Sequence, residues 1–335
     1  QSGTFSNIQI KVSNDLYGDV LSSTFDLVVV ALPGAPTSVA ATSKVDGQSV
    51  VSWQAPLSTG GGAITGYTVT VSPSVTAPSG CTNTTNLSCT FTGLTNGTAY
   101  ALQVRQVNAL GNGASSVTME GIPCTVPAAP TVNQVIAGNA TLSVDFNAAS
   151  NGGSAITAYQ YSTDGGATWS NRAFGSTESP LSITTQSSDG VTALVNGSFY
   201  SVKIRAVNSA GLGVASEAVR IAPLTVPSAP VISSVAMRNS FALLTFSVAS
   251  DGGSPVTAYE YSLNAGISWT NASSLANPMR ISGLRNGSNY SVIIRAVNIA
   301  GAGDSSATSS IAPIGPPDAP RITTLTPSDQ MLEVA

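Results

Sequence analysis

The stretch LVNGSFYSVKIRAVN, residues 194–208, decides the fold, because it occurs three times with the same landmarks. Its counterparts are LTNGTAYALQVRQVN at 94–108 and LRNGSNYSVIIRAVN at 284–298. In each copy an Asn-Gly pair is typical of a tight turn, and the residues after the tyrosine alternate between apolar and polar. The stretch therefore predicts a turn followed by a strand with one face turned inward.

Each copy lies inside a longer repeat that opens on an Ala-Pro pair and recurs at intervals of about 90 to 100 residues. After the pair come an alternating run with a large aromatic residue, a Gly-rich loop and a tyrosine. These positions are Ala35, Ala129, Ala229 and Ala319 for the opening, Trp53, Phe146 and Phe246 for the aromatic, and Tyr67, Tyr159 and Tyr259 for the tyrosine. Short strands separated by frequent turn signals, with no helical pattern, predict one all-β sandwich per interval.

Composition limits the classes of function. The chain has 335 residues, of which 42% are hydrophobic and 8% charged, with a formal net charge of -4. It should fold, and the lack of any basic cluster argues against nucleic acid as a partner. No apolar window is long enough to insert in a membrane, and Gln1 opens the chain without a charged leader, so we expect a piece of a longer or processed protein.

The three repeats resemble fibronectin type III domains. The resemblance rests on the Ala-Pro opening, the aromatic residue, the tyrosine of the third strand and the Leu-x-Asn-Gly-x-x-Tyr block. It implies repeats at 35–126, 127–226 and 227–316. It also implies tyrosine corners, in which a hydroxyl returns to the backbone near the preceding turn, at Tyr100, Tyr200 and Tyr290.

The two ends look like parts of further domains. Residues 1–34 resemble the last strands of a cadherin-like or immunoglobulin-like domain, with a turn near Asp15 to Asp19, and residues 317–335 resemble the first strands of a fourth repeat. A sandwich that lacks most of its strands exposes edges and an apolar face. We expect these to be covered either by more of the same polypeptide or by strand addition from neighbouring copies.

The linkers are rich in proline. GIPCTVPAAP at 121–130, IAPLTVPSAP at 221–230 and IAPIGPPDAP at 311–320 restrict hinging and favour an extended rod of domains. An apolar residue recurs in each, and we expect it to pack against a neighbouring domain: Cys124, Leu224 and Ile314. Cys124 is then either a small buried hydrophobe or a thiol for redox chemistry or crosslinking.

Cys81 and Cys89 lie close together in CTNTTNLSC. Similar pairs occur in bacterial repeats of the fibronectin type III family, so the resemblance implies a disulfide and an extracellular setting. Such a bridge contributes roughly 2 to 3 kcal/mol by the loop-entropy estimate. A pair of unrelated thiols is the alternative, and the spacing does not match a zinc site.

The stretch YSTDGGATWS, residues 161–170, resembles the Asp-box hairpin of sialidases and recurs in altered form at 262–269. Its residues suit a turn, and the arginines that catalysis would require are spread one to a repeat, at Arg105, Arg205 and Arg295. We expect Arg295 to pair with Glu260, and Arg205 to lie opposite Gln160, on the outer face of the sheet. Trp169 and Trp269, expected to be exposed, are candidates for sugar binding.

Catalytic inventories are incomplete. The chain contains no histidine and no phosphate-binding Gly-x-x-x-x-Gly-Lys loop. If residues 1–34 are cadherin-like, calcium is conceivable at Asp15, Asp19 and Asp26, but a solvated turn is the favoured interpretation. We expect no other cofactor.

The sequence therefore predicts a non-catalytic rod, secreted or at the cell surface of a bacterium, that spaces, adheres or assembles into filaments. Its expected partners are copies of itself, neighbouring domains and surface glycans, without nucleic acid or membrane insertion in this segment. The alternative is a carbohydrate-binding accessory region of a glycan-degrading enzyme or a phage fibre, in which Trp169 and Trp269 bind sugar.

Overall fold

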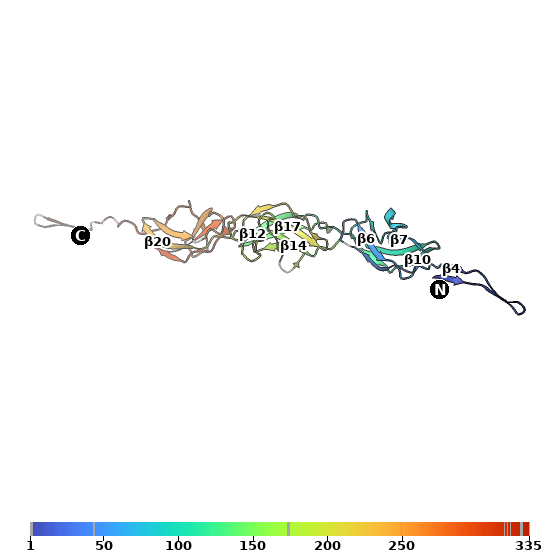
Figure 1. Cartoon of the computed structure of the whole chain (residues 1–335). Coiled ribbons are helices and arrows are strands. Elements are labelled where there is room, and N and C mark those ends of the chain that lie inside the picture. The colour runs from blue at the N-terminus through green and yellow to red at the C-terminus, as the bar shows by residue number, and fades with distance from the viewer. Residues whose placement is uncertain are drawn as a thin grey trace. The chain divides into compact units, whose positions relative to one another are not determined.

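The computed structural model describes residues 3–42, 44–172, 175–248, 250–317, 319, 321, 323–328 and 331–334. This part of the chain is built of β-strands, with a 3-10 turn, η1 (Ser79–Cys81), and without an α-helix (Figure 1). The expected all-β fold is confirmed. In the same ranges, no helix has the length and apolar character needed to cross a membrane.

Close packing divides the chain into two compact units. One comprises Gln1–Gln134, Val144–Leu181 and Val202–Val219, and the other comprises Val135–Ser143, Ser182–Ser201 and Arg220–Ala335. The division falls inside the second repeat. As a result, the junction of repeats 1 and 2 lies within the first unit, and the junction of repeats 2 and 3 lies within the second.

Repeat 1 contains two antiparallel sheets. The smaller has the order β5-β6-β8, and in the larger β7, β10 and β11 all pair with β9. The strands are β5 (Thr37–Ala41), β6 (Ser49–Gln54), β7 (Ile64–Ser72), β8 (Ser88–Phe91), β9 (Tyr100–Asn108), β10 (Gly111–Ser115) and β11 (Met119–Gly121).

The core of repeat 1 follows from the alternation in its strands. Along β9 the side chains of Tyr100, Leu102 and Val104 are buried, while their neighbours face outward or are partly covered. Trp53 on β6 meets Tyr67 on β7 with ring centroids 5.5 Å apart. The aromatic residue of the second strand and the tyrosine of the third therefore pack together between the sheets.

Repeat 2 keeps this plan and adds a short strand, β15, beside β14. Its sheets have the orders β12-β13-β16 and β15-β14-β17-β18, and β19 also pairs with β17. Phe146 and Tyr159 repeat the aromatic contact of repeat 1, at 4.7 Å. The strands are β12 (Thr131–Gly138), β13 (Thr141–Asn147), β14 (Ala158–Ser162), β15 (Ser170–Asn171), β16 (Leu181–Ile183), β17 (Tyr200–Asn208), β18 (Gly211–Leu212) and β19 (Val219–Ile221).

Repeat 3 also follows this plan. Its sheets have the orders β20-β21-β24 and β23-β22-β25-β26, with β27 paired to β25, and Phe246 meets Tyr259 at 4.7 Å. As the alternation predicted, Val292, Ile294 and Ala296 are fully buried. The strands are β20 (Pro230–Arg238), β21 (Phe241–Val248), β22 (Ala258–Ser262), β23 (Thr270–Asn271), β24 (Met279–Ser282), β25 (Tyr290–Asn298), β26 (Gly301–Ala302) and β27 (Ser309–Ile311).

The first segment forms a hairpin. Strand β1 (Gly3–Ile8) pairs with β4 (Phe25–Val29), and β2 (Lys11–Asn14) pairs with β3 (Gly18–Leu21) around the turn expected near Asp15 to Asp19. Its apolar side chains are largely exposed. The assignment of residues 1–34 to a cadherin-like or immunoglobulin-like domain stays a prediction.

The last segment contains β28 (Leu325–Ser328) and β29 (Met331–Val334), which pair as an antiparallel hairpin. The prediction of a fourth repeat at 317–335 falls partly outside the described residues, because Pro320 and several of its neighbours lie there.

Candidate functional site

The junction of repeats 1 and 2 is made by two glycine-containing loops. At the Asn-Gly turn of repeat 1, Asn96 accepts a hydrogen bond from the Gly47 N–H at 2.9 Å, and the Gly97 N–H donates to Pro123 O at 2.8 Å. The Gly-rich loop of repeat 2 lies against this turn. A Cβ placed on Gly153 would lie only 2.4 Å from the nitrogen of Gly97, so the two backbones touch where no side chain fits.

Hydrogen bonds fix the linker to the incoming repeat at the same place. The Thr125 N–H donates to Gly152 O at 2.8 Å, and the side-chain amide of Asn208 donates to Thr125 O at 2.8 Å. The Val214 N–H donates to Pro127 O at 3.0 Å. The linker is therefore held by loops of repeat 2 as well as by its prolines.

The junction of repeats 2 and 3 reproduces this arrangement. Gly197 and Gly253 take the places of Gly97 and Gly153, and the corresponding Cβ-to-nitrogen distance is again 2.4 Å. The Thr225 N–H donates to Gly252 O at 2.8 Å, and Asn298 donates to Thr225 O at 2.8 Å.

A third junction joins the first segment to repeat 1. The Ala31 N–H donates to Gly60 O at 2.7 Å, and the Asn108 side chain donates to Ala31 O at 2.8 Å. A Cβ on Gly61 would lie 2.9 Å from the nitrogen of Gly3. The hairpin thus takes the position that a preceding repeat has at the other junctions.

The three apolar linker positions differ in burial. Cys124 is 3% exposed, with its Sγ 3.9 Å from Ser209 Oγ, and Leu224 is half-buried. Ile314 is 66% exposed. The expectation that each of the three packs against a neighbouring domain stays a prediction for Ile314, which no described segment covers.

The tyrosine hydroxyls return to the backbone at each Asn-Gly turn. The hydroxyls of Tyr100, Tyr200 and Tyr290 accept hydrogen bonds from the backbone N–H groups of the residues five positions before them, at 3.1, 3.0 and 2.9 Å. Each hydrogen bond fastens the turn to the strand that follows it. The corners therefore hold in shape the loops that make the junctions.

The loop from Tyr161 to Ser170 is held by its own polar side chains. The Asp164 carboxylate accepts hydrogen bonds from the Thr168 N–H at 3.0 Å and from the Ser162 hydroxyl at 2.7 Å. The indole nitrogen of Trp169 donates to Gly166 O at 3.0 Å. In repeat 3 the neutral Asn264 replaces the aspartate and accepts from the Ser268 N–H at 2.9 Å.

Burial acts to raise the pKa of Asp164, but the hydrogen bonds from Thr168 and Ser162 outweigh it. They stabilise the ionised carboxylate and lower its pKa to about 2. The ionised carboxylate therefore stabilises the turn from which it accepts these hydrogen bonds.

The two tryptophans are half-buried, not exposed as expected. The Arg205 guanidinium lies 4.1 Å from the centre of the Trp169 ring, and that of Arg295 lies 4.0 Å from Trp269. One face of each ring is therefore covered by a cation–π contact, which the sequence did not predict. The strand order was the signal for these contacts. Trp169 and Trp269 directly precede β15 and β23, which pair with β14 and β22, the strands beside the two arginines.

The predicted cross-strand partners of the arginines are confirmed. Arg295 Nε lies 2.6 Å from Glu260 Oε2, and Arg205 Nε lies 2.8 Å from Gln160 Oε1, with each pair in direct register. The two clusters have the same geometry, but only the cluster in repeat 3 is ionic.

The disulfide between Cys81 and Cys89 is present. It joins η1 to β8, and both cysteines are buried. Thr84, inside the closed loop, exchanges backbone hydrogen bonds with Tyr67 at 2.7 and 2.9 Å. The bridge therefore fixes a loop against β7 in repeat 1. At the same place repeats 2 and 3 have the loops that carry Trp169 and Trp269, here called the tryptophan loops.

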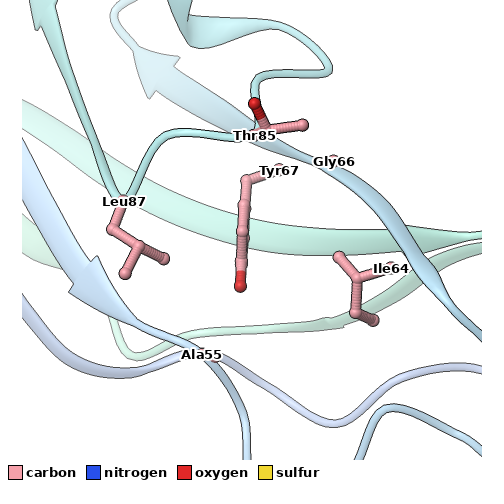
Figure 2. Close-up of a pocket in the computed structure, with 6 residues that line it drawn as sticks. All are labelled: Ala55, Ile64, Gly66, Tyr67, Thr85 and Leu87. Atoms are coloured by element: carbon pink, nitrogen blue, oxygen red, sulfur yellow. The ribbon is translucent and has the colours of Figure 1, made fainter.

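The loop closed by the disulfide lines a pocket of about 330 Å³ in repeat 1 with Thr85 and Leu87. Figure 2 shows the Tyr67 ring standing between Leu87 and Ile64, with its hydroxyl towards Ala55. Nearby in the core, Trp53 Nε1 and the Gln106 amide are buried without a hydrogen-bond partner in the described part of the chain. The alternation in the sequence does not predict this pocket, although Gln106 stands out where repeats 2 and 3 have alanine.

The aspartates considered for calcium do not converge. Asp19 forms an ion pair with Lys11 and accepts a hydrogen bond from Ser13, which together lower its pKa. Asp26 accepts from the Asn7 N–H at 3.2 Å. Among the described residues, no three carboxylate or thiol side chains lie close enough to hold a metal ion.

Comparison with known proteins finds a family match for the first repeat. Residues 34–122 match the family described as "Fibronectin type III domain". Among solved structures, that of the chicken CNTN1 FN1–FN3 domains has 18% sequence identity and a TM-score of 0.35, and the alignment covers 85% of this chain and 100% of that one. Repeat 1 is thus similar to fibronectin type III domains, and repeats 2 and 3 share its plan of two antiparallel sheets.

Proposed function

We propose that this chain is a non-catalytic, extracellular structural or adhesive segment whose repeats set the spacing along a cell-surface or filamentous protein. The observation that carries the proposal is the junction, which recurs with the same backbone contacts between repeats 1 and 2 and between repeats 2 and 3. A flexible linker does not require a glycine of one repeat to touch the backbone of a glycine in the next. Restraint of one repeat by the next is what a spacer requires.

Two further observations support the proposal. The buried disulfide of repeat 1 suits an oxidising compartment outside the cytoplasm. Asp164 in the loop before Trp169, and the strand residues Arg205 and Arg295 that cover the two tryptophans, all have structural partners. These side chains stabilise loops and strands and do not point into a common pocket.

The alternative, recognition of glycans through Trp169 and Trp269, is less well supported. Sugars stack on an open aromatic face, and an arginine already covers one face of each ring. Binding of soluble polysaccharides that Trp169→Ala and Trp269→Ala abolish together would favour this alternative over a spacer.

Electron microscopy of the purified chain tests the proposed function. For a spacer we expect particles of one narrowly distributed end-to-end length, or ordered filaments in which that length is the repeat. Compact particles or a broad spread of lengths would contradict the proposal. Turnover of a glycoside by the same material would contradict the absence of catalysis.

A further inference from the structure

The end of repeat 3 carries the same turn as the two junctions between repeats. Asn286 accepts a hydrogen bond from the Ser240 N–H at 2.9 Å, and the Gly287 N–H donates to Pro313 O at 2.9 Å. The φ of Gly287 is 74°, against 80° for Gly97 and 82° for Gly197. The turn therefore has the conformation that meets a Gly-Gly loop at the other two junctions.

The surroundings of this third turn are different. A Cβ on Gly97 or Gly197 would lie 3.1 Å from the Cα of the glycine that faces it, whereas a Cβ on Gly287 meets nothing within 4 Å. The neighbouring Ile314 is 66% exposed, although its counterpart Cys124 is 3% exposed. An apolar side chain and a shaped turn thus lie together on an open surface.

The backbone of the linker offers the remaining contacts. Gly315 occupies the position of Thr125 and Thr225, whose N–H groups donate to the Gly-Gly loops and whose carbonyls accept from asparagines. No described residue hydrogen-bonds to the Gly315 N–H or its carbonyl. Within the described residues, the Gly315 N–H and carbonyl are therefore a free donor and a free acceptor, whereas the matching groups of Thr125 and Thr225 are hydrogen-bonded.

We propose that the Asn286–Gly287 turn, Ile314 and Gly315 form a docking surface for a further β-sandwich repeat joined directly after them. That repeat must bring a Gly-Gly loop whose first carbonyl accepts from the Gly315 N–H. Its second residue must be glycine, because a Cβ at the matching positions would lie 2.4 Å from the facing backbone nitrogen. It must also bring a strand-end asparagine to donate to Gly315 O.

A second copy of this chain does not fit the surface. Its Gly60–Gly61, Gly152–Gly153 and Gly252–Gly253 loops are already in contact with Ala31, Thr125 and Thr225 of the same chain. A repeat linked in series is favoured because each of those loops belongs to the domain that directly follows the linker it holds. The proposal rests on the proposed spacer function, because it names the partner of the same kind of junction.

Hydrogen exchange at Gly315 tests the proposal. In one chain, residues 321–335 are replaced by a second copy of residues 231–316; in the other, the present chain is unchanged. We expect the Gly315 N–H to exchange at least about tenfold more slowly in the extended chain, and to approach Thr225, which serves as the internal reference. A control extended chain carries Ser in place of both loop glycines of the appended copy, and there the protection should be lost.

Exchange of the strand amides in the appended copy shows whether that copy has folded. If it is folded and Gly315 exchanges as in the unchanged chain, the proposal is wrong. Protection of Gly315 that appears in the unchanged chain as concentration rises would also overturn it, in favour of a second copy. Either result leaves the particle lengths seen by electron microscopy unaffected, so the spacer function and the docking surface can fail separately.

Discussion

A single side chain distinguishes the two tryptophan loops in their response to acid. The lowered pKa of Asp164 means that its ionised form stabilises the loop fully above the ordinary pKa of an aspartate. This contribution is lost as the pH falls towards about 2, the value in the folded loop. Asn264 has no proton to gain, so the loop of repeat 3 should be unaffected.

Amide chemical shifts followed from pH 5 to about pH 1, through the lowered pKa of Asp164, measure this difference. The Thr168 N–H should shift with a midpoint near the lowered pKa, while the Ser268 N–H should not titrate. Asp164→Asn should make the first loop behave like the second. Equal titration of both amides would show that Asp164 is not the group responsible.

Gln106 gives a second prediction at the scale of the residue. Its amide is fully buried and unpaired in the described structure, and an unpaired buried amide costs about 1 to 3 kcal/mol. Gln106→Met removes the polar group at similar volume, so we expect the free energy of unfolding of repeat 1 to rise by about 1 kcal/mol. Urea denaturation monitored by exchange of the β9 amides measures it, and a loss of stability would contradict the prediction.

Contacts set by strand register were predictable, and contacts set by loop geometry were not. The pairing of Arg295 with Glu260 followed from period-2 alternation and strand order alone. The contact of the same arginine with Trp269 requires the hairpin to fold back over the sheet, which depends on loop geometry. The burial of Gln106 was also missed, because a polar residue at an inward position of a strand breaks the apolar pattern by which buried residues are predicted.

At the scale of the element, the disulfide loop should stabilise repeat 1 alone. Reduction of the Cys81–Cys89 bridge frees the loop that pairs with Tyr67, and we expect the free energy of unfolding of repeat 1 to fall by roughly 2 to 3 kcal/mol. Native-state hydrogen exchange distinguishes the repeats, because β25 of repeat 3 should keep its protection. An equal loss in both repeats would mean that the bridge acts beyond its own domain.

The junction loops give a matched pair of substitutions within repeat 3. Gly253 and Gly266 have φ values of 89° and 92°, so alanine at either position costs about 1 to 2 kcal/mol of backbone strain. A Cβ on Gly253 would also lie 2.4 Å from Gly197 N, whereas one on Gly266 makes an ordinary contact at 3.4 Å.

We therefore expect Gly253→Ala, but not Gly266→Ala, to speed exchange of the Thr225 N–H by at least about tenfold. Equal exchange in the two variants would show that the facing glycines do not hold the junction.

The elements themselves were largely predictable, while the contacts between them were not. Turn signals and alternation predicted the strands, and the prolines predicted restricted linkers. The facing of an Asn-Gly turn by a Gly-Gly loop was missed, because each motif is explained by its own turn. Only the three-dimensional structure shows that Gly97 and Gly153, far apart in the sequence, need their lack of side chains for the same contact.

At the scale of the whole molecule, repetition in the sequence determined both what was predicted and what was missed. The equivalence of Cys124, Leu224 and Ile314 suggested one role, but Ile314 is exposed where Cys124 is buried. Family resemblance correctly identified the fold of repeat 1. The rod, the bacterial source and the cadherin-like character of residues 1–34 remain predictions, because the family match covers repeat 1 alone.

We propose that the junctions restrain the orientation of each repeat relative to the next. Residual dipolar couplings of the β9 amides in repeat 1 and the β14 amides in repeat 2 test it most directly. One common alignment tensor should describe both sets in the unmodified chain, and Gly153→Ala, but not Gly287→Ala, should separate them. Two independent tensors in the unmodified chain would contradict the claim.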